Sequence, residues 1–185
     1  MAIVELRTER LILRRWREAD RERFARMNRD PAVMEFFPAI LSPAESDAMA
    51  DRIEAHFAEY GFGLWAAELS SAGEFIGYIG LAVPQFEAAF TPCVEIGWRL
   101  AVQHWGKGLA TEGARAVVGH AFGDLGLREV VSFTAEANFR SRRVMEKLGM
   151  TCDPDEDFDH PLLPEGHRLR RHVLYRIGHR KLQAV

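Results

Sequence analysis

The sequence predicts an α+β fold in which a mostly antiparallel mixed sheet of six or seven strands is combined with about four helices. Three observations support this prediction. Several short segments alternate apolar and polar residues, which is the period of a strand with one buried face. Other segments carry apolar residues three and four positions apart, which is the period of a helix packed on one side. Two of the strand-like segments are separated by only four residues, including Gly73, as in an antiparallel hairpin.

The first part of the chain is expected to form one strand and two helices. The alternation over residues 8–16 predicts the strand. Asp20 is expected to cap a short helix that stops before Pro31, because the residue before a proline avoids the helical conformation. Residues 42–45 form a capping box with proline at the first helical position, so a second helix should begin there and end at Gly61.

The middle of the chain predicts the hairpin and the most informative segment of the sequence. Hairpin strands are expected over residues 62–69 and 74–83. Another strand is expected over residues 94–102 and is followed by a short loop over residues 105–108. A helix with apolar residues at helical spacing should begin at Leu109.

The last part predicts two strands, a helix and a long loop. Residues 129–135 have the composition of a strand, Asn138 is placed to begin a helix, and Gly149 is placed to end it. Residues 152–171 are acidic and contain prolines, which favours a long loop. A final strand is expected over residues 172–177.

Length and composition favour a single domain over residues 1–185, large enough to bury a core without disulfides or metals. The formal net charge of −3 gives no electrostatic reason to expect nucleic acid or a membrane surface as a partner. The N-terminus lacks the apolar run of a signal peptide, and no apolar run approaches the ~20 residues of a membrane span. Cys93 and Cys152 form no disulfide framework. We therefore expect a cytoplasmic protein.

The loop between the central strand and the following helix has the features of a phosphate-binding site. A strand, a glycine-rich turn containing Gly106 and Gly108, and a helix start direct several backbone N–H groups and the positive end of a helix dipole to one place. A Walker loop is excluded because Ala101 stands where its first glycine belongs, and Thr111 replaces the third glycine of the dinucleotide motif. A turn that needs its glycines only for shape stays an open alternative.

Three stretches of the chain resemble the GNAT N-acetyltransferase superfamily. Trp105, Gly108 and Ala110 occupy the first, fourth and sixth positions of its acyl-CoA pyrophosphate motif, Q/R-x-x-G-x-G/A. Tryptophan at the first position departs from that motif, but W-G-K-G-x-A-T-E resembles the ribosomal-protein N-terminal acetyltransferases of the RimJ/RimL type. Residues 138–150 resemble the second family motif, N-x-x-S-x-x-x-x-E-K-x-G-F, with methionine in the last place, and residues 8–16 resemble the opening of the same branch.

The resemblance implies an acyl-CoA N-acyltransferase fold with acetyl-CoA as the acetyl donor. It implies that the end of the central strand pairs with the pantetheine arm, and that N–H groups of the loop hold the pyrophosphate. Lys107 either adds charge at this place or is simply solvated. Asn138 would contact the cofactor arm, with capping of its helix as an alternative role that is compatible with this contact. The cofactor-binding residues implied in this way are Leu100, Ala101, Val102, Trp105, Gly106, Lys107, Gly108, Ala110, Thr111, Asn138 and Ser141.

Two residues are candidates for catalysis in the direct transfer that the resemblance implies. Ser141 matches the serine of the second motif and would donate a hydrogen bond to the departing thiol. Glu95 lies within the central strand, in an E-I-G-W setting similar to that of the family, and would act as a base through a water molecule. An ion pair with Arg99 is the alternative for Glu95.

A weak base favours an acceptor amine that is already partly neutral, such as a peptide N-terminus or a small amine of low pKa. The alternatives are an amino acid, a polyamine or a drug-like amine, a non-catalytic CoA sensor, and an unrelated α+β interaction domain. Dimerisation is common in the resembled family, so a homodimer is an expectation. Histidines in residues 160–179 match no zinc spacing, so we expect no metal site and a solvated segment.

Overall fold

The computed structural model describes residues 4–179, in which it contains four α-helices and a mixed nine-stranded sheet. The helices are α1 (Asp20–Asn28), α2 (Pro43–Tyr60), α3 (Leu109–Gly123) and α4 (Phe139–Lys147). The strands are β1 (Leu6–Arg7), β2 (Leu11–Arg14), β3 (Leu64–Leu69), β4 (Glu74–Ala82), β5 (Glu95–Leu100), β6 (Glu129–Ala135), β7 (Thr151–Cys152), β8 (Phe158–Asp159) and β9 (Arg171–Gly178). The predicted fold class is confirmed, and the strand number exceeds the expected six or seven because β1, β7 and β8 have only two residues each.

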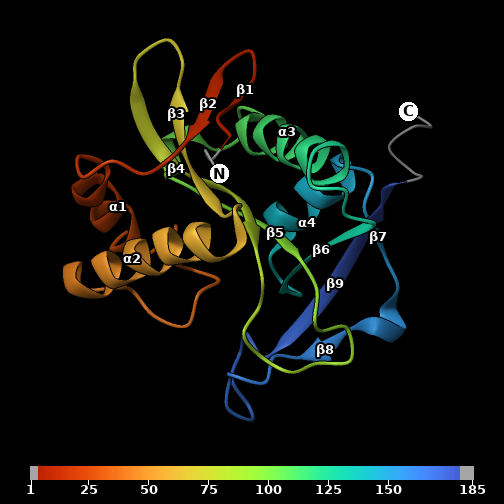
Figure 1. Cartoon of the computed structure of the whole chain (residues 1–185). Coiled ribbons are helices and arrows are strands. Elements are labelled where there is room, and N and C mark those ends of the chain that lie inside the picture. Colours follow the sequence, from red (N-terminus) through yellow and green to blue (C-terminus); the bar gives the residue numbers. More distant parts are fainter. Residues whose placement is uncertain (1–3, 180–185) are drawn as a thin grey trace.

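The strands follow the order β1-β2-β3-β4-β5-β6-β9-β7, and β8 pairs with β9 (Figure 1). Every neighbouring pair is antiparallel except β5 and β6, which are parallel. The helix α3 connects these two parallel strands, as a parallel pair requires. The N-terminal elements therefore lie on one side of the β5–β6 junction and the C-terminal strands on the other.

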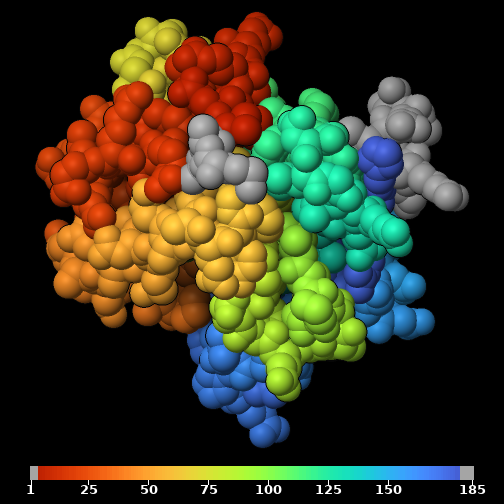
Figure 2. All heavy atoms as spheres, viewed as in Figure 1, coloured from red at the N-terminus to blue at the C-terminus, as the bar shows by residue number. Residues whose placement is uncertain are grey.

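Two apolar cores lie on opposite faces of this sheet. On the face that we call the α3 face, Ile96 and Leu100 of β5 pack with α3 residues such as Ala114 and Val117. On the other face, the α1 face, Phe24 of α1 packs with residues of β3 and β4. Because side chains alternate along a strand, Glu95, Gly97 and Arg99 of β5 belong to the α1 face. Figure 2 shows the red-to-orange N-terminal segments on one side of the molecule and the segments from α3 onward on the other.

Most predicted helix ends are confirmed, and one cap is corrected. Ser42 and Glu45 form the predicted capping box of α2, and Gly61 ends that helix with a φ of +76°. Asp20 does not cap α1. It is the first residue of the helix, and its carboxylate accepts hydrogen bonds from the guanidinium of Arg14 and the N–H of Arg17 instead.

The segment predicted as one long loop over residues 152–171 is also corrected. It contains the end of β7, the 3-10 turn Pro154–Glu156 and the strand β8. Periodicity could not reveal strands of two residues, because they are too short to show an alternation. None of the helices in residues 4–179 has both the length and the apolar character that a membrane crossing requires.

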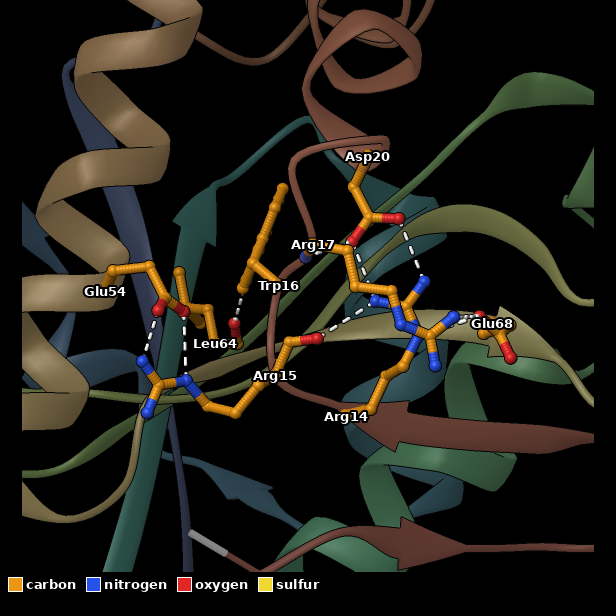
Figure 3. A network of polar contacts seen from close by, with 8 residues as sticks. All are labelled: Arg14, Arg15, Trp16, Arg17, Asp20, Glu54, Leu64 and Glu68. Atoms are coloured by element: carbon orange, nitrogen blue, oxygen red, sulfur yellow. Dashed lines mark hydrogen bonds and ion pairs between the residues drawn. The ribbon is translucent and has the colours of Figure 1, made fainter.

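A buried ionic network joins the start of α1 to the sheet (Figure 3). Arg14, which is 4% exposed, donates to both oxygens of Asp20, at 2.7 and 2.9 Å, and to Glu68 on β3 at 2.7 Å. Arg17 reaches the same Glu68 oxygen from the solvent side. Burial alone would lower the pKa of Arg14, but its hydrogen bonds to Asp20 and Glu68 and their charges raise that pKa.

Because removal of one partner leaves a buried charge short of compensation, Asp20→Ala should lower the free energy of unfolding by about 3 kcal/mol. The matched control is Asp51→Ala, which removes an exposed carboxylate paired with Arg21 and should change stability little. Urea unfolding at pH 7 measures both variants. Equal, small losses in the two would contradict the structural importance of the Arg14 network.

Candidate active site

The strands β5 and β6 are paired at one position and then separate. Glu95 lies opposite Val131, and the N–H of Val131 donates to Val94. One residue further along, the hydroxyl of Ser132 donates to the carbonyl oxygen of Ile96 at 2.9 Å. No ladder pairing between these strands is found beyond this point in residues 4–179. The edge of β5 that faces β6 is therefore open from Trp98 to the end of the strand.

The loop after β5 presents a row of unpaired backbone donors. The N–H groups of residues 106–111 have no hydrogen-bond acceptor within the described part of the chain. Gly106 and Gly108 both have a positive φ, +71° and +80°, a conformation that glycine adopts at little cost. The starts of α2 and α4 have side-chain caps from Ser42 and Asn138, whereas the start of α3 has none. This arrangement fits a phosphate or diphosphate group.

An acidic residue in the first turn of α3 is held away from these donors. The carboxylate of Glu112 accepts from the hydroxyl of Thr8 at 2.6 Å and from the backbone and side chain of Arg10 at 2.9 and 2.7 Å. Burial would raise the pKa of Glu112, but these hydrogen bonds and the charge of Arg10 together lower it. Arg10 also donates to the carbonyl of Lys107 at 3.0 Å. The β1–β2 turn thus supports the loop and leaves its N–H groups free.

The predicted contacts with the pantetheine arm depend on main-chain groups, and some of these groups already make hydrogen bonds within the protein. The indole N–H of Trp105 donates to the carbonyl of Leu100 at 2.7 Å, so this side chain closes the loop onto the strand. The N–H of Ala101 is bonded to Ile76 of β4 and therefore points away from the open edge. The N–H of Val102 has no partner in the described residues. Lys107 is exposed and makes no ion pair within residues 4–179.

The start of α4 brings Ser141 beside β6. Asn138 caps the helix by accepting from the N–H of Ser141 at 3.2 Å, and its amide nitrogen donates to Thr134 at 2.9 Å. Asn138 therefore caps the helix, and its contact with the cofactor arm stays a prediction. The hydroxyl of Ser141 is half-buried and has no partner among the described residues. Tyr175, which sequence patterns did not single out, places its hydroxyl 3.3 Å from both Arg142 and Glu146 of α4.

Glu95 is an isolated carboxyl group on the α1 face. It makes no hydrogen bond or ion pair within residues 4–179, so the expected alternative of an ion pair with Arg99 is wrong. Although part of the residue remains exposed, burial raises the pKa of the Glu95 carboxyl from its ordinary 4.5 to about 8. A group with a pKa in this range exchanges protons near neutral pH, as a general base must.

A cluster of half-buried aromatic rings lies on the α1 face beyond Glu95. Phe133 of β6 belongs to it, because side chains alternate along the strand and Phe133 is on the same face as Val131, the residue paired with Glu95. The cluster joins β6, β8 and β9 to the loop over residues 84–92. Figure 2 shows the yellow-green part of the chain, which includes this loop, beside the blue C-terminal part. Its members are Phe86, Phe90, Phe133, Phe158, His160 and His172.

The expectation of a solvated histidine segment is thus wrong for His160 and His172. Burial lowers the pKa of both, that of His172 to about 4, so both rings are neutral at pH 7. Within residues 4–179 no group of three or more His, Cys, Asp or Glu residues is arranged to hold a metal ion.

Comparisons with known proteins identify the family of this chain. The acetyltransferase (GNAT) domain family matches residues 10–151. The chain belongs to the GNAT acetyltransferases. It is 31% identical over 150 residues to an uncharacterized protein, YkkB, of Bacillus subtilis, covering 80% of this chain and 86% of that protein.

Solved structures of acetyltransferases resemble this GNAT domain over nearly its whole length. An acetyltransferase from Agrobacterium tumefaciens superposes with a TM-score of 0.76 at 29% identity, covering 96% of this chain and 95% of that one. Mycobacterium smegmatis RimJ in complex with CoA-disulfide has a TM-score of 0.74 at 20% identity, covering 97% of this chain and 88% of that one, a similarity of fold alone. The donor of this family is acetyl-CoA, and the free N–H groups of residues 106–111 fit its diphosphate.

Because a side chain at a φ of +80° is strained, Gly108→Ala should turn the N–H groups of this GNAT domain's loop and weaken CoA binding about tenfold or more. The control is Gly73→Ala, which introduces the same kind of strain at a φ of +61° in the β3–β4 turn. Calorimetric titration with CoA compares the two. Unchanged affinity in Gly108→Ala would show that the loop does not hold the cofactor.

The raised pKa of Glu95 predicts a pH-dependent stability. Between pH 4.5 and about 8 the folded state binds a proton that the unfolded state has lost, so this group's contribution to stability falls as the pH rises. Glu95→Gln removes the titration. Its stability relative to the wild type should therefore increase from pH 5 to pH 9, by a few kcal/mol, since each pKa unit corresponds to ~1.4 kcal/mol. Urea unfolding across this range tests the prediction, and a pH-independent difference would contradict it.

Proposed function

We propose that this acetyltransferase is of the ribosomal-protein type and acetylates a peptide N-terminal α-amine or another amine of low pKa. The observation that supports the proposal most strongly is Glu95, a carboxyl group with no hydrogen-bond or ionic partner among the described residues and with its pKa raised to about 8. An α-amine with a pKa of ~7.7–8.0 matches such a base, whereas a lysine amine at ~10.4 holds its proton too tightly. The W-G-K-G-x-A-T-E wording and the 8–16 segment support the branch.

Each part of the site has a task in this proposal. When bound, acetyl-CoA supplies the thioester that the amine attacks. The N–H groups of residues 106–111 hold the diphosphate, and the open edge of β5 with the N–H of Val102 aligns the arm that follows it. Glu95 receives the proton of the amine from the α1 face. Ser141, held at the first turn of α4 by its Asn138 cap, donates to the departing sulfur.

A thiol-release assay with acetyl-CoA tests the proposal. The acceptors are short peptides with an Ala, Ser or Met N-terminus, free amino acids and polyamines. The proposal predicts thiol release with the peptides. Binding of CoA without thiol release from any amine would instead identify a non-catalytic CoA sensor, and release with polyamines alone would identify a small-molecule enzyme.

Two substitutions in the same assay test the catalytic roles. Glu95→Gln should lower kcat by about 10- to 100-fold, less than the largest effects of a lost general base, because the amine is partly neutral already. Ser141→Ala should lower kcat by about tenfold with little change in CoA affinity. The controls are Glu22→Gln on α1 and Ser71→Ala in the β3–β4 turn, both of which change exposed side chains. If kcat survives both site substitutions, neither residue is catalytic.

A further inference from the structure

Arg99 is a buried cation that lacks a carboxylate partner within residues 4–179. Its residue exposure is 6%. One terminal nitrogen donates to the amide oxygen of Asn28 at 2.6 Å and lies 3.8 Å from the sulfur of Met49, and the side chain of Tyr78 is a further hydrogen-bonding neighbour. Its Nε is fully enclosed and has no partner. The guanidinium carbon lies 3.7 Å from the ring centre of Phe37 and 5.4 Å from that of Tyr78.

Arg14, which is also buried, shows how a buried guanidinium in the described residues is compensated by carboxylates. Two carboxylates, Asp20 and Glu68, compensate Arg14, and its pKa is raised (Figure 3). Burial lowers the pKa of Arg99, and the neighbouring Tyr78 only partly offsets this effect. A buried charge without a counter-ion is costly, so its presence calls for an anion that the described residues do not supply.

Arg99 belongs to the same side of the sheet as the proposed base. Glu95, Gly97 and Arg99 alternate along β5 and share the α1 face. A Cβ atom at Gly97 would meet no other atom within 4 Å, so there is open space above the strand between the two charged residues. Their Cα atoms are about 13 Å apart, because a strand rises ~3.3 Å per residue. The surface over Gly97 thus has a proton acceptor at one end and an unpaired cation at the other.

We infer that this surface binds an acceptor that carries a carboxylate a few bonds from its reacting amine, with the carboxylate on Arg99 and the amine toward Glu95. The inference rests on the proposed function and narrows its substrate class to peptides with an acidic residue near the N-terminus and to comparable amino acids. Because the Nε of Arg99 is enclosed, the carboxylate is expected to approach the terminal nitrogens of the planar guanidinium. The span over Gly97 suits an acidic side chain at the second or third residue of a peptide.

The test compares pairs of peptides that differ only in one charge. Ala-Glu-amide is paired with Ala-Gln-amide, and Ala-Ala-Glu-amide with Ala-Ala-Gln-amide. The wild type should acetylate the acidic member of at least one pair with a kcat/KM about tenfold or more above that of its neutral partner. Calorimetric titration of the cofactor-free protein with the same peptides gives a readout independent of catalysis and should show the same order of affinity.

Variants connect this preference to Arg99. Arg99→Met fills a similar volume without charge and should bring the acid-to-amide ratio close to one in both measurements. Arg99→Lys keeps the charge but loses the planar guanidinium, so it should retain part of the preference for acidic peptides. This variant tests the inference even if Arg99→Met folds poorly. The matched control is Arg171→Met, which removes an exposed arginine 3.8 Å from Asp159 and should keep the wild-type ratio.

The outcomes separate this inference from the proposed function. Equal acetylation and binding of acidic and neutral peptides would overturn the role of Arg99 while leaving α-amine acetylation intact. A ratio that persists in Arg99→Met would also overturn it. Acid-selective binding that depends on Arg99, without thiol release from any peptide, would support the anion site and overturn the proposed function.

Discussion

A single parallel pairing between β5 and β6 determines where the parts of the site lie. The strands pair at Glu95 and Val131, and the hydroxyl of Ser132 donates to the carbonyl oxygen of Ile96 one residue further along, where the strands begin to separate. Without such a link the whole edge of β5 that faces β6 would be unpaired. Several buried backbone N–H and C=O groups would then lack hydrogen bonds, which costs free energy. The link confines the opening to the end of β5. The loop with the free N–H groups then starts next to this opening. Glu95 lies at the other end of β5, where the two strands are still paired.

The molecule treats buried charge in two ways. Arg14, Asp20 and Glu68 form a compensated group that joins β2, β3 and α1. On the α1 face, by contrast, Glu95 and Arg99 have no ionic partner in the part of the chain that the structure describes. The first arrangement stabilises the fold, because removal of any member leaves a buried charge short of compensation. The second costs stability in the absence of a ligand. Uncompensated groups of this kind are concentrated where a protein binds and reacts with something else.

Local sequence patterns were sufficient to predict the fold and the cofactor loop. They were insufficient to predict the surface between Glu95 and Arg99 that we propose for the acceptor. The capping box at Ser42 and the strand over residues 129–135 depend on neighbours in sequence, so they could be predicted to the residue. Glu112 is held by Thr8 and Arg10 across about a hundred residues, and the burial of Arg99 depends on Asn28 and on Phe37 in another segment. No spacing rule connects such distant residues, and periodicity marks Arg99 only as one polar position of an alternating strand.

A crystal structure of the protein with bound CoA tests the central claim most directly, because it shows where the diphosphate lies. The predicted result is a diphosphate within hydrogen-bond distance of N–H groups in residues 106–111, with the following arm along the open edge of β5. A diphosphate bound elsewhere, with these N–H groups facing solvent or a protein side chain, would contradict the claim that the loop exists to hold the cofactor.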